Sequence, residues 1–144
     1  MATRRKCWQV RDKGQLLLAV MKALEADDAR IFFEGDLKDL SSRYPDASPQ
    51  PADAPRPNTL RHDCIVIPLK PSSSERIYAA LGGTVPKTLL HVRIEKGGVL
   101  QFGAYDHFHP ECIYFGNDVR PATIELLVSE GVIRPVIEKQ AKSR

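Results

Sequence analysis

The chain has 144 residues, of which 42% are hydrophobic and 27% charged, as is typical of one globular domain rather than a disordered chain. No apolar run approaches the roughly 20 residues of a membrane-spanning helix, so we expect no membrane partner. The formal net charge of +3 lies at the two ends, because residues 7–138 hold 15 basic and 18 acidic residues. We therefore predict a single domain over 1–144 with flexible basic ends at 1–6 and 139–144. Nucleic acid would bind only weakly, through those ends.

The first periodic segment predicts a helix. Its apolar residues recur at the spacing of one helical stripe: Leu16, Leu17, Val20, Met21 and Leu24. Asp12 is a suitable N-cap, and the acidic pair Asp27–Asp28 is unfavourable at the negative end of a helix dipole. We expect the helix to begin after Asp12 and to end near this pair, with short strands at Cys7–Val10 and Ile31–Phe33 on either side.

Residues 41–59 contain five prolines, at positions 45, 49, 51, 55 and 57. Proline removes a backbone donor and fixes φ, so this density excludes a helix or a central strand. The segment predicts a long surface loop that could also serve as a partner-binding arm.

Residues 64–83 predict a strand followed by a short helix. Cys64–Ile67 is apolar and is followed by Pro68, which is typical of a buried strand. Ser72 and Glu75 have the spacing of a capping box, and the helix that follows should stop at Gly82–Gly83.

Residues 90–104 predict a β-hairpin, because apolar and polar residues alternate on both sides of a glycine turn. A two-residue loop at Gly97–Gly98 would place Ile94 opposite Gln101 and mix the two faces. A three-residue loop over Lys96–Gly98 keeps one face apolar, and we predict it. It pairs Ile94 with Leu100, Val92 with Phe102 and Leu90 with Ala104.

The last third predicts a strand at 111–116 and a helix with Pro121 in its first turn and Gly131 at its stop. A last strand over 132–137 contains Pro135 and so belongs at a sheet edge. The complete order of elements predicts an α+β fold. We expect a mixed, mainly antiparallel sheet of about five or six strands, with two to three helices packed on one face.

The other face of that sheet would carry polar side chains. By strand alternation it includes His91, Arg93, Gln101 and Tyr105. Such a face is either solvated or available to a partner. We assign a candidate binding role to these residues and to His107 and His109, which follow them along the chain.

The densest group of reactive side chains lies at 105–112. If residues 105–109 stay extended, His107 and His109 point to one face and could bind one metal ion, with Cys112 or Glu111 as a third ligand. This is the candidate metal site, and zinc is the ion that its residue types favour.

Two observations weigh against a metal cofactor. A His-x-His pair is a loose pattern, and Pro110 interrupts the strand where a third ligand is needed. A second candidate ligand pair, His62 and Cys64, has no companion motif. We therefore expect no cofactor, with zinc at His107, His109 and Cys112 as the alternative.

The same cluster could support acid–base catalysis, with His107 or His109 beside Asp106 or Glu111 and Arg93 as an anion-binding residue. Cys112 beside His109 could act as a nucleophile. No Gly-x-Ser-x-Gly elbow, P-loop or GxGxxG motif accompanies these groups. The sequence therefore favours a protein that is not an enzyme.

We expect a small protein-binding module, with a regulatory or immunity-like role, that uses the uncovered sheet face and the 105–115 segment. In size and charge the chain is similar to small bacterial immunity and antitoxin proteins, and this resemblance implies a protein partner. The alternative is a small metal-dependent or histidine-based hydrolase centred on His107 and His109.

The three cysteines, Cys7, Cys64 and Cys112, cannot all pair within one chain. With no apolar signal-peptide stretch after the basic N-terminal residues, the odd count predicts reduced thiols and a cytoplasmic location.

Overall fold

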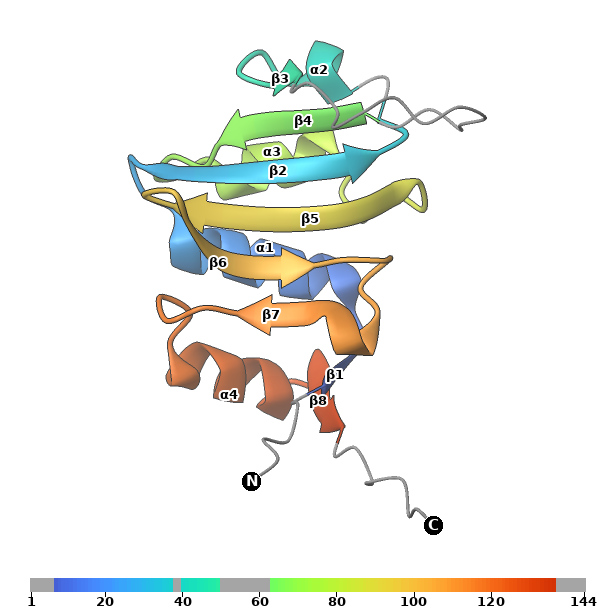
Figure 1. The fold of residues 1–144 in the computed structure, drawn as a ribbon, viewed down its shortest axis with the longest axis vertical. Coiled ribbons are helices and arrows are strands. Elements are labelled where there is room, and N and C mark those ends of the chain that lie inside the picture. Colours follow the sequence, from blue (N-terminus) through green and yellow to red (C-terminus); the bar gives the residue numbers. More distant parts are fainter. Residues whose placement is uncertain (1–6, 38–39, 50–62, 137–144) are drawn as a thin grey trace.

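A computed structural model describes residues 7–37, 40–49 and 63–136. These residues form the predicted α+β fold, with a six-stranded main sheet and a separate two-stranded sheet (Figure 1). All neighbouring strands of the main sheet are antiparallel. Its strands follow the spatial order β3 (Ser48–Pro49), β4 (Asp63–Pro68), β2 (Ala29–Gly35), β5 (Leu89–Lys96), β6 (Val99–Ala104) and β7 (Ile113–Phe115).

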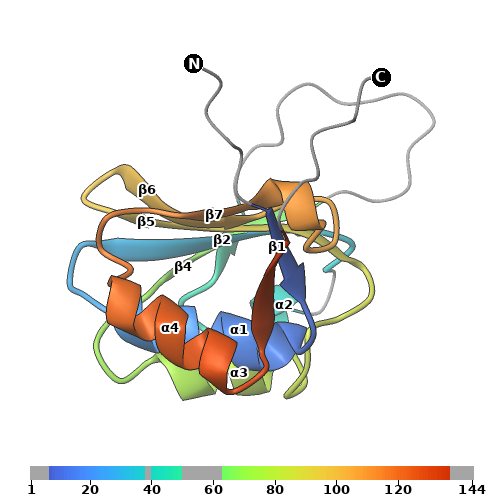
Figure 2. The same cartoon turned by 90° about the horizontal axis from the view of Figure 1, so that it is seen from below.

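The three longer helices of the described residues lie on one face of the main sheet, as the prediction requires (Figure 2). They are α1 (Lys13–Leu24), α3 (Ser74–Ala80) and α4 (Pro121–Ser129). We call the face that they cover the inner face and the opposite face the outer face. Strands β1 (Cys7–Val10) and β8 (Ile133–Val136) pair beside the β7 end of the sheet.

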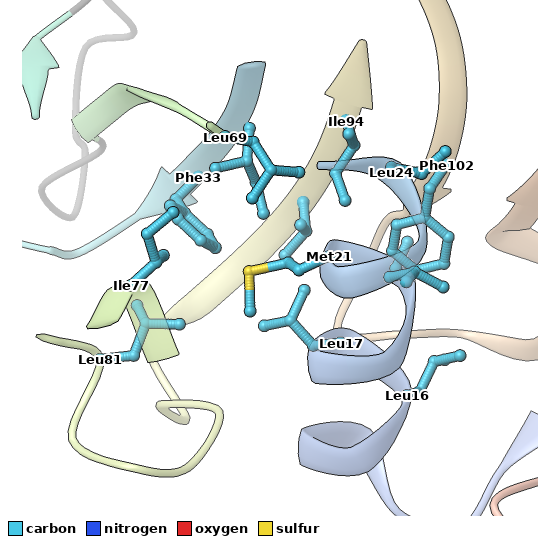
Figure 3. Close-up of a cluster of buried hydrophobic side chains, with 14 of the residues drawn as sticks. Leu16, Leu17, Met21, Leu24, Phe33, Leu69, Ile77, Leu81, Ile94 and Phe102 are labelled. Carbon is cyan, nitrogen blue, oxygen red and sulfur yellow. The ribbon is translucent and has the colours of Figure 1, made fainter. Parts of the chain in front are cut away.

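The core lies between the inner face and the helices. The predicted stripe of α1 is fully buried, and Figure 3 shows Leu17 and Met21 of this helix among side chains of the sheet and of α3. Phe33, Ile94 and Phe102 enter the same layer from β2, β5 and β6 with no exposed surface. Burying one such side chain contributes about 1.5–3 kcal/mol, so this layer supplies most of the hydrophobic stabilisation.

The predicted pairing of the β5–β6 hairpin is wrong. The turn has two central residues, Gly97 and Gly98, whose φ values of 58° and 80° suit the tight hairpin turn that matches strand twist. Lys96 therefore pairs with Val99, and the register then shifts so that Ile94 lies opposite Phe102. Gln101 is the extra residue of this β-bulge, which restores an apolar inner face without the longer loop.

The predicted capping box at the start of α3 is also wrong. Ser73 is the N-cap residue, and its side chain makes no capping hydrogen bond. The cap comes instead from Glu25, just after α1, whose carboxylate accepts hydrogen bonds from the amides of Ser72 and Ser74 and from the Ser74 hydroxyl. Burial raises the pKa of Glu25, but these bonds and the nearby Lys22 together hold that pKa below its ordinary value.

The proline-rich segment is a loop only in part where the structure describes it. A short helix α2 (Leu40–Arg43) forms before the first proline, and β3 then pairs with β4 at the edge of the main sheet, where proline is tolerated. Residues 50–59 of the predicted loop and the basic ends at 1–6 and 139–144 lie outside the described residues.

Candidate functional site

One row of residues crosses the outer face from strand to strand. Cross-strand pairing places Val66 of β4 beside Phe32 of β2, and Phe32 beside Arg93 of β5. Arg93 in turn lies opposite Gly103 of β6, and Gly103 opposite Tyr114 of β7. Because side chains of one row share a face, this row crosses the outer face from one side of the sheet to the other. Val66, Phe32 and Gly103 are buried within it, Arg93 is partly exposed, and Tyr114 is exposed.

Arg93 occupies the middle of this row and is held on several sides. Its guanidinium lies 3.2 Å from the Glu34 carboxylate and 3.3 Å from that of Glu95. The same group stacks over the Phe32 ring, 4.0 Å from the ring centroid. Arg30 adds a second cation, 3.6 Å from Glu95. These four charged residues balance, and the cation–π contact fixes the guanidinium in place.

Tyr105 follows β6 and folds back over the outer face. The absence of a side chain at Gly103 makes room for it, because a Cβ atom there would lie 2.7 Å from the Tyr105 ring. The ring also lies against His91, with the centroids 5.7 Å apart. Burial raises the pKa of the Tyr105 phenol, and Glu34 and Glu95 raise it further, while Arg93 opposes them. Tyr105, His91 and Arg93 thus form one cluster, as the sequence predicts.

Gln101 does not belong to this cluster. It is buried, with 6% of its surface exposed, because it is the extra residue of the bulge. Its side-chain oxygen accepts a hydrogen bond from the Asp118 amide at 2.9 Å, and its carbonyl accepts one from Gly116. Gln101 therefore holds the connection between β7 and α4 and is not placed to bind a partner.

Residues 106–108 form a left-handed turn, so the assumption that 105–109 stay extended is wrong. Asp106, His107 and Phe108 have φ values of 54°, 57° and 62°. This conformation costs roughly 1–2 kcal/mol for each residue other than glycine. Burial of the Phe108 ring, which contributes about 1.5–3 kcal/mol, offsets part of that strain.

The histidines of the candidate metal site do not converge. His107 and His109 are exposed, and Nδ1 of His109 accepts a hydrogen bond from the Glu111 amide at 3.1 Å. Cys112 ends a short 3₁₀ turn, Pro110–Cys112, beyond that bond. Among the described residues, no three histidine, cysteine or acidic side chains lie close enough together to hold a metal ion. The second candidate pair is His62 and Cys64, and His62 lies outside the residues that the structure describes.

A pocket of about 280 Å³ lies away from this cluster, beside α2 and α3. Leu37, Leu40 and Leu81 supply apolar walls, and Asp36 and Arg43 are its charged residues. The described lining contains no histidine or cysteine, so it lacks the side chains that the predicted chemistry requires.

Four outer-face residues are not among the candidates that the sequence singles out: Phe32, Glu34, Glu95 and Tyr114, although Tyr114 lies within the predicted 105–115 segment. Tyr114 lies between Ile113 and Phe115, and this alternation could have placed it on the outer face. Phe32 lies within the run Ile31–Phe33, where every residue is apolar and alternation gives no signal. Only the pairing of β2 with β5 reveals that Phe32 faces Arg93.

No helix in the described part of the chain has both the length and the apolar character needed to cross a membrane. The chain matches no protein-family model, no curated protein and no solved structure.

Proposed function

We propose that the chain is a protein-binding module whose outer sheet face docks onto a partner protein. The observation that carries this proposal is the row from Val66 to Tyr114, which crosses the sheet on the face opposite the three longer helices. Tyrosine and arginine are the residue types enriched among interface anchors, and this row holds both.

The electrostatics of the outer face support a protein partner over nucleic acid. Among the described residues, Arg30 and Arg93 are matched there by Glu34 and Glu95, so these four groups together offer phosphate no net positive charge. Arg93 is already fixed by its ion pairs and by Phe32, so binding would order few additional rotamers. A rigid, neutral, partly aromatic face suits a protein surface.

The hydrolase alternative has less support. It needs His107 and His109 to converge on a reacting group, but only His107 lies in the left-handed turn. His109 follows that turn, and its Nδ1 accepts a hydrogen bond from the Glu111 amide. An imidazole already bonded in this way has one nitrogen fewer for proton transfer. A regulatory or immunity-like role remains part of the binding proposal.

Affinity capture with the purified chain as bait, from a lysate of its native cell, tests the proposal. We expect a partner that binds wild type and binds the Tyr114→Ala variant about 30-fold more weakly, the effect of removing an interface anchor of about 2 kcal/mol. Tyr114 is 48% exposed, so this change should leave the fold intact.

Leu126→Ala is the matched control, because Leu126 is 56% exposed and lies on α4, on the inner side of the sheet. It removes a similar exposed apolar group without touching the outer face. Equal binding by all three proteins, loss of binding in Leu126→Ala, or no partner for wild type would each contradict the proposal.

A further inference from the structure

The left-handed turn at 106–108 is joined to the sheet through His91. The Asp106 amide donates a hydrogen bond to Nδ1 of His91 at 3.0 Å. His91 lies on β5, and the two residues are 15 positions apart, so this contact is tertiary rather than local to the turn. It fixes the first of the three residues with positive φ.

The direction of this bond defines the protonation state of His91. A backbone N–H can only donate, so Nδ1 must offer a lone pair and carry no proton. The imidazole is therefore neutral, with its proton on Nε2. In imidazolium both ring nitrogens are donors, and the Asp106 amide would then face an N–H group instead of an acceptor.

We propose that His91 is a pH-sensitive switch that holds Asp106, the first residue of the 106–108 turn, against the sheet when neutral and releases it when protonated. Histidine is the residue type whose ordinary change of charge falls between pH 5 and 8, so this is the range in which to test the proposal. The strain of three left-handed residues favours departure from this conformation once the bond is lost.

Among the described residues, the charged and titratable groups around His91 come from β2, β4, β5 and the segment that follows β6. Glu34 lies opposite on β2, and Arg93 lies two residues along β5 on the same face. The Tyr105 ring contacts the imidazole, and Asp106 follows it in the turn. Cys64 lies one strand farther away, opposite Glu34. Glu34 is paired with Arg93, whose guanidinium lies 3.2 Å from its carboxylate.

Release of this bond would be local. The His107 amide still donates to the Leu90 carbonyl at 2.9 Å, and the His109 amide donates to the Tyr105 carbonyl at 3.1 Å. Phe108 remains buried in the core. The expected change is movement of Asp106 and of the adjoining Tyr105 ring, not unfolding. This inference concerns the chain itself and does not depend on the proposed partner.

Nuclear magnetic resonance of the full chain, labelled with ¹⁵N, tests the switch between pH 8 and pH 5. We expect the His91 ring nitrogens to titrate and the Asp106 amide proton to shift upfield with the same midpoint. The exchange protection of that amide, corrected for intrinsic rates, should fall about tenfold across the titration, the effect of losing one ordinary hydrogen bond.

Two variants separate His91 from its neighbours. In His91→Asn the side-chain oxygen can replace Nδ1 as a permanent acceptor, so the Asp106 amide should no longer respond to pH. His107→Asn removes a titrating ring from the same turn and should leave the Asp106 response unchanged. The amide of Glu111, which donates to His109, reports that second imidazole separately.

Three results would overturn the proposal. They are an Asp106 amide that does not move while His91 titrates, a His91 ring that stays neutral down to pH 5, and a folded His91→Asn variant with the wild-type response. If His91→Asn fails to fold, the midpoints of the His91 ring and the Asp106 amide in the wild-type chain still test the proposal, because it requires them to coincide.

Discussion

The two faces of strand β5 are held in place by different kinds of interaction. Val92 and Ile94 point inward and have no exposed surface, whereas His91, Arg93 and Glu95 point outward and are partly exposed. The inner residues contact other apolar groups without directional bonds. The outer residues make directional contacts, each with a named partner on a neighbouring strand or turn.

The two faces of this strand therefore contribute differently to stability. The stabilisation from burying apolar side chains is large. Truncating one of them lowers the stability markedly, because the surrounding side chains collapse only partly into the cavity. Exposed ion pairs contribute little to folding, since solvent screens them and their side chains lose entropy. The partly exposed charged residues of β5 can therefore be replaced at small cost to the fold.

The largest expected effect comes from truncating one ring on each face. Phe102→Ala on the inner face should lower the free energy of unfolding by about 3–5 kcal/mol, because it leaves a cavity. Tyr114→Ala on the outer face should change it by less than about 1 kcal/mol, as is usual for exposed positions. Urea unfolding of both variants measures the contrast, and equal losses would show that the outer face is also core.

An intermediate effect is expected at Gly103, where the outer face is tightly packed. Gly103→Val places a side chain against the Tyr105 ring and should lower the free energy of unfolding by about 1–3 kcal/mol. In a Tyr105→Ala background the same substitution should cost far less, because the obstructing ring is gone and valine suits a strand. A double-mutant cycle by urea unfolding measures this coupling, and additive effects would contradict the placement of Tyr105.

The smallest effect on stability is expected at Arg93. Arg93→Gln should lower the free energy of unfolding at neutral pH by about 1 kcal/mol or less. The pKa of Tyr105 is already raised in the folded chain, and the variant should raise it further, because the Arg93 charge lowers it. Ultraviolet titration of the phenol, with a Tyr105→Phe variant subtracted, measures the pKa. Arg30→Gln removes a cation that is not among the causes of the shift and should leave it unchanged.

The raised pKa of Tyr105 determines how the stability of the fold changes with pH. The folded chain holds the Tyr105 proton more tightly than the unfolded chain does, so stability falls as pH rises through the ordinary tyrosine range. Arg93→Gln should deepen this alkaline loss. A Tyr105 pKa that falls in the variant would show that Arg93 does not face the phenol.

The sequence predicts most of the fold because its periodicities are strong and local. The stripe from Leu16 to Leu24 and the alternation around Val92 are each sufficient to assign an element and its buried face. The hairpin pairing could not be predicted in the same way. Strict alternation of apolar and polar residues predicts a register without a break. The chain instead keeps the favoured two-glycine turn and shifts the register with a bulge at Gln101.

The candidate site is less accessible from the sequence because it depends on long-range geometry. His91, Arg93 and Tyr105 come together as alternation predicts, and this part of the site could be found. The local sequence marks the left-handed turn at 106–108 only weakly, since aspartate and histidine are enriched at positive φ but phenylalanine is not. The turn exists because the sheet, the core and His91 hold it from outside.

The cap that Glu25 provides to α3 bears on the order in which the chain folds. Helix α3 has seven residues, shorter than a helix that is stable in isolation. Its first amides are satisfied by a carboxylate 47 and 49 positions earlier in the chain. The cap of this helix therefore depends on a tertiary contact with the end of α1, and α3 is capped only in chains in which that contact has formed.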